Sequence, residues 1–254
     1  MKGQMSTKRK ATKAGPRRAS ISKSARSKKY VAYASYIITL ILVFLFIFSQ
    51  VNFADMGCTA YNINSFSSMP LHCRLSAANN TIYLSLLFPS IVFSYLLFKG
   101  KQISSIISEL GLSRKAFTAR NILIGISLFF AIILLSIAMG LFSEVTSIPL
   151  PTNVTALLGG MPLYLLVFSF LIAPIDEEIL FRGFLVPRIG IIASALLFAL
   201  LHFSYSSISE VVAALVFGLL AGYVFKRTKS LYASITGHIL VNMLTIIAML
   251  LAGI

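Results

Sequence analysis

Three short groups of polar residues interrupt the apolar C-terminal half of this 254-residue chain. In order they are Glu177, Glu178 and Arg182, then Phe198 and His202, and finally His238 and Asn242. Carboxylates and imidazoles can take a proton from water, while imidazole and amide N–H groups can stabilise an oxygen that becomes negative. Together these side chains predict the hydrolysis of a bond such as a peptide bond by an activated water.

Four of these residues are the candidate catalytic groups. We expect Glu177, with His202 beside it, to hold and deprotonate the water, which contributes roughly 10²–10⁴ in rate. His238 and Asn242 are four residues apart and therefore share a helical face. Both carry N–H donors, so we expect them to stabilise the oxyanion.

The remaining three residues are expected to support the catalytic groups. Glu178 and Arg182 share a helical face and can pair. Such a pair relieves the repulsion between the adjacent carboxylates of Glu177 and Glu178. Phe198 shares a face with His202. Pro174 cannot donate a backbone hydrogen bond and is expected to kink its helix just before the glutamates.

The composition places these residues in a membrane. The chain is 57% hydrophobic and only 11% charged, with a mean hydropathy of +0.89, whereas soluble domains are about a quarter charged. Runs long enough to cross a bilayer predict an all-α, polytopic transmembrane bundle of about seven spans, or eight. The predicted spans are 30–54, 75–98, 121–143, 145–175, 189–209, 211–225 and 230–254.

Basic residues indicate the orientation of the bundle. The net charge is +15, and eleven of the 22 Lys and Arg residues fall within the first 29 positions. Because basic residues favour the cytoplasmic side, we expect the N-terminus on that side of the membrane. Of the Lys and Arg residues, only Arg74 is then expected on the outer side. The chain is thus expected to be a multi-pass integral membrane protein, in the cell membrane if its source is prokaryotic.

The chain divides into three expected regions. Residues 1–29 are expected to form a basic, disordered cytoplasmic tail that contacts anionic lipids. This tail lacks the aromatic residues that stack on nucleic acid bases, so no nucleic acid partner is expected. Residues 30–156 form N-terminal transmembrane helices, with an external loop at 55–80 and an interfacial helix at 102–117. Residues 157–254 form the catalytic core.

Two cysteines lie in the expected external loop. Cys58 and Cys73 suit a disulfide in an oxidising compartment, and two free thiols are the alternative. His72 stands beside Cys73, but a single loop histidine is more often solvated than bound to a metal.

The polar groups are expected at a common depth in the bilayer. At about 1.5 Å per residue, Glu177 lies about 15 Å from the inner end of its helix, and His202 about 20 Å along the next one. His238 and Asn242 lie at about 12 and 18 Å on the last span. Buried charges are costly in lipid, so this coincidence predicts one shared internal site rather than an interfacial cluster.

The three motifs, in this order, resemble those of the CAAX prenyl protease and bacteriocin-processing family, over roughly residues 162–248. The resemblance implies an intramembrane endopeptidase whose membrane-associated substrates include prenylated CAAX proteins. It also implies that Glu177 and His202 activate water while His238 and Asn242 form the oxyanion hole.

Several alternatives stay open. Zinc bound by Glu177, His202 and His238 is one, but no His-Glu-x-x-His motif is present and Asn242 is a poor zinc ligand, which favours a metal-free, glutamate-dependent reaction without a cofactor. A non-catalytic protein of the bacteriocin-immunity type is another. A proton-coupled carrier is a third, although the chain has no internal repeat.

Overall fold

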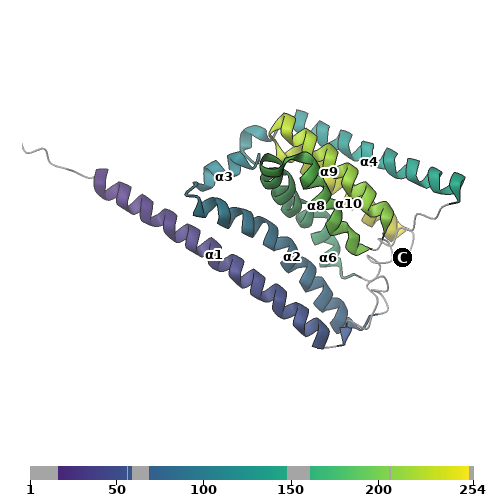
Figure 1. Ribbon diagram of the computed structural model, residues 1–254, viewed down its shortest axis with the longest axis horizontal. Helices are drawn as coiled ribbons and strands as arrows, with labels where there is room; N and C mark the ends of the chain where they lie inside the picture. Colours follow the sequence, from purple (N-terminus) through teal and green to yellow (C-terminus); the bar gives the residue numbers. More distant parts are fainter. Residues whose placement is uncertain (1–16, 56, 59–68, 148–160, 206, 252–254) are drawn as a thin grey trace, which may run out of the picture.

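The computed structural model describes residues 17–55, 57–58, 69–147, 161–205 and 207–251. Every regular element within these ranges is helical, which confirms the predicted all-α fold. Figure 1 shows the long helices running roughly side by side, with α1 and α2 along one edge and α4 along the opposite edge.

Six helical stretches are long and apolar enough to cross a membrane. They are α1 (Arg17–Asp55, apolar over Lys29–Ser49), α2 (Leu71–Phe98), α4 (Ala119–Thr146), the stretch Leu163–Leu201, α9 (Ile208–Thr228) and α10 (Leu231–Leu251). The chain is therefore a multi-pass integral membrane protein. The orientation of the bundle stays a prediction.

The predicted count of seven spans differs from six because of the stretch Leu163–Leu201. It joins α6 (Leu163–Val167), a π-helical segment η4 (Phe168–Ile172), α7 (Ala173–Glu178), a second π-helical segment η5 (Ile179–Leu185) and α8 (Val186–Leu201). Within α8, Gly190 has φ 86° and ψ 171°, so the helix breaks there into two arms. These arms correspond to the fourth and fifth predicted spans.

The position of this break was predicted wrongly. A proline disfavours helical backbone at the residue before it, which predicts a helix end at Pro187, but η5 runs directly into α8 and the helix continues through Pro187. The chain turns instead at Gly190, because a positive φ is open to glycine and strained for other residues.

The N-terminal tail also differs from its prediction. We expected disorder up to Lys29, but α1 begins at Arg17. Residues 17–29 contain neither Pro nor Gly. They extend a helix that the apolar segment has already nucleated, so each added residue costs no new nucleus. The part of the predicted tail before Arg17 lies outside the described residues.

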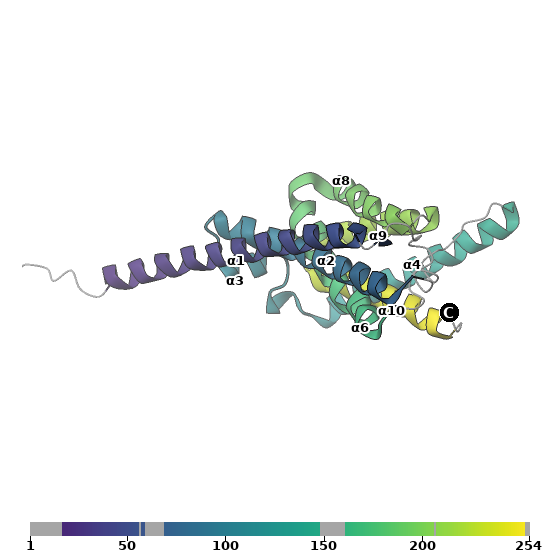
Figure 2. The same ribbon diagram turned by 90° about the horizontal axis from the view of Figure 1, so that it is seen from below.

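Hydroxyl groups join α1 to α2. The Thr39 hydroxyl lies 2.6 Å from that of Ser90 and 2.8 Å from that of Ser94, and the Ser35 hydroxyl lies 2.8 Å from that of Ser94. Figures 1 and 2 show α1 running beside α2 at the edge of the bundle. Because lipid offers no hydrophobic drive for two helices to associate, such hydrogen bonds contribute to their pairing.

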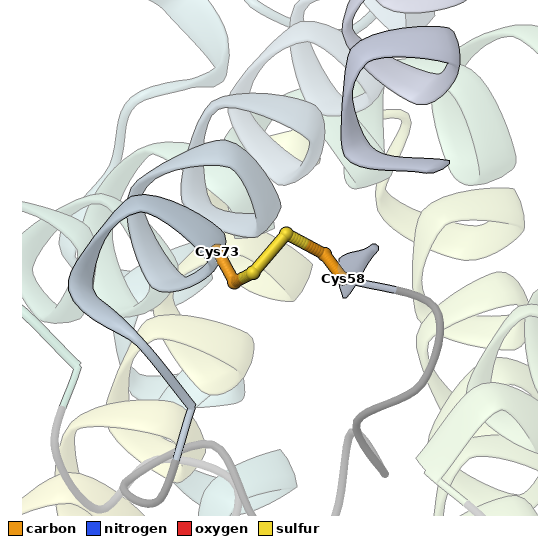
Figure 3. Close-up of a disulfide and its surroundings, with 2 residues drawn as sticks. All are labelled: Cys58 and Cys73. Carbon is orange, nitrogen blue, oxygen red and sulfur yellow. A yellow bond between two sulfur atoms is a disulfide. The ribbon is translucent and has the colours of Figure 1, made fainter. Parts of the chain in front are cut away.

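A disulfide joins Cys58, which follows α1, to Cys73 in the first turn of α2 (Figure 3). Cys58 and Cys73 are bonded, with 5.5 Å between their Cα atoms, which confirms the disulfide alternative. Because α2 already begins at Leu71, the loop predicted at 55–80 is shorter than expected. The donor atoms of Cys58, His72 and Cys73 lie within 4.8 Å of one another, but both sulfurs are bonded and unavailable to a metal.

The predicted interfacial helix forms, but its apolar face packs on protein. It consists of α3 (Ile103–Glu109) and the short helix η3 (Arg114–Ala116). Ile106 and Leu110 are fully buried. The Leu231 N–H donates to the Gly111 carbonyl at 3.1 Å, and the Tyr232 hydroxyl donates to the Leu112 carbonyl at 3.0 Å. This segment therefore closes the end of the bundle at which α10 begins.

Glu109 ties α3 to its neighbours. Its carboxylate accepts from Lys101 and, at 3.0 Å, from Arg188. The Lys101 hydrogen bond is the main interaction that lowers the pKa of Glu109, and Arg188 adds to it. The Arg188 guanidinium lies 3.8 Å from the centre of the Phe184 ring. Lys101, from the segment between α2 and α3, and Arg188 of α8 thus meet at the end that α3 closes, hereafter the basic end.

Two glycines bring α4 against α10. A Cβ on Gly125 would lie 2.4 Å from the Ala233 carbonyl oxygen, and one on Gly237 would lie 2.9 Å from the Gly125 carbonyl oxygen. Neither contact can relax by a side-chain movement, because both involve backbone atoms. This close approach sets the position of His238, the next residue after Gly237.

We expect Gly125→Ala to destabilise the protein by about 1–3 kcal/mol, because the added methyl group forces the two backbones apart. The matched control is Gly140→Ala on the same helix, where a Cβ would meet nothing within 4 Å. There, alanine is expected to be neutral or to stabilise by up to about 1 kcal/mol, since it favours the helix. Thermal unfolding in detergent measures both; equal changes would contradict the role of Gly125.

Candidate active site

A buried ion pair lies at the centre of the site. Glu178 ends α7 and Arg182 lies one turn later, in η5. Arg182 Nη1 is 2.8 Å from Glu178 Oε1, and their side chains are 1% and 0% exposed. The predicted pairing is confirmed. The Arg182 guanidinium carbon also lies 4.1 Å from the Phe198 ring centre and 5.1 Å from that of Phe217, which adds cation–π stabilisation.

His238 connects this ion pair to Glu177. His238 Nδ1 lies 3.1 Å from Glu178 Oε1, and Nε2 lies 3.6 Å from Glu177 Oε2. The imidazole thus stands between two carboxylates from another helix. The Glu177 side chain is 22% exposed, whereas that of Glu178 is fully buried. Of the two adjacent glutamates, only Glu177 is accessible to a water or a substrate from outside.

His202 lies at the other side of Phe198. It follows the last residue of α8, and its Nδ1–H donates to the Phe198 carbonyl at 3.0 Å. This hydrogen bond leaves the lone pair on Nε2, where a proton can be accepted. The Phe198 ring centre is 4.6 Å from that of His202 and 5.8 Å from that of His238. Contact of His202 with Glu177 stays a prediction.

Two π-helical segments flank the glutamates. The segment η4 precedes α7 and η5 follows it directly. In η4, the Ala173 N–H bonds the Phe168 carbonyl, five residues earlier, so the Ser169 carbonyl loses its usual partner. Its alternative partner in a π-helix would be residue 174, but Pro174 has no N–H. Such π-bulges are frequent at functional sites. Pro174 thus changes the helix winding just before the glutamates.

Asn242 satisfies the carbonyl that this winding leaves free. Its Nδ2 donates to the Ser169 carbonyl at 3.0 Å. One of the two amide protons of Asn242 is therefore engaged with the backbone, which the sequence did not predict. The contact fixes α10 to η4, and only the second amide proton is left for an oxyanion.

We expect Asn242→Ala to destabilise the protein by about 1–3 kcal/mol, because the Ser169 carbonyl would lose its donor within the bundle. Asn242→Asp tests the same contact at similar volume, since a carboxylate cannot donate. Both variants should unfold at lower temperature than the wild type in detergent. Normal stability in both would mean that Asn242 acts on the substrate alone.

Sequence reasoning missed Phe217 in α9. Its ring centre lies 4.8 Å from that of His238, and the ring also faces Arg182. A signal was present in the small residues Ala214, Gly218 and Ala221, which let one face of α9 approach its neighbours. A phenylalanine between them therefore points into the bundle.

Asp176, the first acid of the same cluster, is a second buried carboxylate, and its partner was not predicted. Asp176 Oδ2 accepts a hydrogen bond from the Ser85 hydroxyl at 2.9 Å, and both residues are buried. The two residues belong to α7 and α2. This contact links the glutamate helix to the N-terminal part of the bundle.

The candidate zinc ligands do not assemble into a complete site. Glu177 Oε2 and His238 Nε2 are 3.6 Å apart, close to the separation of two ligands on one tetrahedral zinc. A catalytic zinc needs three protein ligands. Among the described residues, however, His202 does not complete a set of donor atoms within 4.8 Å of one another. The arrangement thus offers two donors.

The region that holds these residues is similar to a known protein family. Residues 159–244 match the family described as type II CAAX prenyl endopeptidase Rce1-like. The chain is 35% identical over 80 residues to the uncharacterized protein YpbD of Bacillus subtilis (strain 168), an alignment that covers 30% of this chain and 41% of that protein. No solved structure matches. The chain is thus similar to the type II CAAX prenyl endopeptidase Rce1-like family over residues 159–244, the region that holds the candidate site.

Proposed function

We propose that the chain is an intramembrane endopeptidase, which hydrolyses peptide bonds of membrane-associated substrates with a water activated by Glu177. The observation that carries this proposal is the contact of His238 with both Glu177 and Glu178 inside a bundle of apolar helices. Charged side chains inside a membrane cost free energy, so a group of them there indicates a function.

Glu177 is the general base in this proposal. Its side chain is partly exposed, and within the described part of the chain no arginine forms an ion pair with it as Arg182 does with Glu178. It can therefore take the proton of an attacking water. Glu178 is fully buried and already paired, so its carboxylate remains ionised without reaching the substrate.

His238 donates to the oxyanion. The Glu178 carboxylate accepts from Nδ1–H and stabilises the imidazolium, as a carboxylate does for the histidine of a serine protease. Nε2, which lies 3.6 Å from Glu177 Oε2, then donates to the oxygen that becomes negative as the water held by Glu177 attacks the carbonyl. The proton that Glu177 gains from water then passes to the leaving amine.

His202 and Asn242 complete the site. His202, whose ring is held by the hydrogen bond from Nδ1 to the Phe198 carbonyl, helps to orient the attacking water in this proposal. The second amide proton of Asn242 can join His238 at the oxyanion. Both roles agree with those that the resemblance to the family implies.

The first substrates to test are prenylated C-terminal CAAX peptides, because the family that matches residues 159–244 is described by this activity. The chain, in vesicles, is incubated with a membrane fraction and with a farnesylated peptide, and the peptides are compared by mass spectrometry with those from Glu177→Gln. New termini in the wild-type sample alone are expected. Identical peptides in both samples would favour a non-catalytic protein.

We further propose that the reaction needs no metal, since two donors are arranged where a catalytic zinc needs three. Elemental analysis of the purified protein is expected to give less than stoichiometric zinc, and dialysis against a chelator should leave the turnover number unchanged. Stoichiometric zinc, with activity lost on chelation and restored by zinc, would contradict this.

A further inference from the structure

A pocket opens between α4 and α9, and none of the site residues lines it. Its volume is about 600 Å³. The first turns of α4 contribute Thr118, Arg120 and Ile124, and the last turns of α9 contribute Tyr223, Val224 and Arg227. No acidic side chain is among the described residues that line it.

The pocket lies at the basic end. Ser230, just after α9, donates to the Ala116 carbonyl of η3 at 3.0 Å. The neighbouring segment begins with Thr118, whose side chain caps α4 by accepting from the Asn121 N–H at 3.2 Å. If basic residues face the cytoplasm, the pocket opens at the inner surface of the membrane.

The charges around the pocket favour an anion. Arg120 lies in the first turn of α4, which contains no acidic residue. A helix N-terminus carries partial positive charge and amide donors without partners inside the helix, so a cation there is unfavourable by itself. Arg227 approaches from α9, with its guanidinium carbon 5.2 Å from the Tyr223 ring centre. A bound anion would compensate both guanidinium groups and the helix end.

We propose that this pocket binds the phosphate group of an anionic phospholipid. Guanidinium groups match phosphate oxygens with paired hydrogen bonds, and basic pockets between transmembrane helices bind lipid head groups. Ile124 and Val224 supply an apolar wall for the glycerol and upper acyl chains. A soluble phosphate compound shares the phosphate chemistry but leaves this wall unused, which favours the lipid.

The test uses the purified chain in a neutral detergent, with native mass spectrometry and thermal unfolding as the two measurements. Phosphatidylglycerol, phosphatidylcholine and inorganic phosphate are added separately. The double variant Arg120→Gln with Arg227→Gln removes both guanidinium groups. The matched control, Arg114→Gln with Lys115→Gln, removes the same charge from exposed residues of η3 that do not line the pocket.

Phosphatidylglycerol is expected to stay bound to the wild type and to the control variant and to raise the unfolding temperature of both. Phosphatidylcholine is expected to have no effect on either. Because two basic residues near a membrane surface both contribute to the attraction of an anionic lipid, the double variant should bind phosphatidylglycerol about thirty-fold more weakly than the wild type. Equal weakening in the control would show unspecific attraction and overturn the site. Equal stabilisation by inorganic phosphate would overturn the lipid assignment.

Discussion

Glu177→Gln is expected to lower kcat for peptide hydrolysis by about 10²–10⁴ while KM changes little, because the amide keeps the shape of the side chain but cannot take a proton from water. Turnover of a cleaved membrane peptide, followed by mass spectrometry, measures the loss. Folding should be preserved, since the ion pair between Glu178 and Arg182 does not involve Glu177.

The matched control for this prediction is Glu210→Gln at the start of α9. Ser207 caps this helix by accepting from the Glu210 N–H at 3.4 Å. Glu210 lies in another helix and is expected to have no part in catalysis. Wild-type turnover in the Glu177 variant would refute the mechanism, and equal losses in both variants would indicate a general effect of carboxylate removal.

Arg182→Ala is expected to destabilise the protein by about 3–5 kcal/mol, the largest effect on stability that we predict. The change leaves the fully buried Glu178 carboxylate without its cationic partner, and an uncompensated buried charge is costly. It also removes the guanidinium that packs on Phe198 and Phe217. Thermal or denaturant unfolding in detergent measures the loss.

Two further variants separate the ion pair from other effects. In Glu178→Gln with Arg182→Met, no charge is left unpaired, so much of the lost stability should return. Arg188→Ala is the control within the same stretch, since its partly exposed ion pair with Glu109 is expected to contribute about 0–1 kcal/mol. If the double variant were as unstable as Arg182→Ala, the packing of the guanidinium and not its charge would dominate.

Local spacing explains what the sequence predicts well. Glu178 and Arg182 pair because residues four apart share a helical face, and that relation does not depend on how helices pack. The transmembrane character follows from composition in the same way. The disulfide between Cys58 and Cys73 was favoured over two free thiols because both cysteines were expected in one loop outside the membrane, and it is confirmed.

Contacts between helices were harder to predict. Whether His238 faces Glu177, Glu178 or both depends on how α10 crosses α7, and that crossing depends on the close approach of α4 to α10 at Gly125. The sequence predicts that these groups lie at one depth, but it does not predict how far each helix is rotated about its own axis.

Backbone hydrogen-bond register was not accessible from the sequence. Pro174 indicated a disturbed helix, but the π-helical winding that frees the Ser169 carbonyl depends on which carbonyl each N–H selects. The role of Asn242 follows from that register. Likewise, the break at Gly190 rather than at Pro187 depends on a backbone angle that only the folded chain specifies.

The difference in exposure between the two adjacent glutamates has a practical consequence. Glu178 belongs to the buried ion pair, whereas Glu177, the proposed base, is partly exposed, so replacing Glu177 is expected to remove the proposed chemistry and keep the binding surface. The glutamine variant at Glu177 should therefore act as a trap, holding an uncleaved client protein long enough for cross-linking. Such captured complexes would identify the natural partners of the chain directly in living membranes.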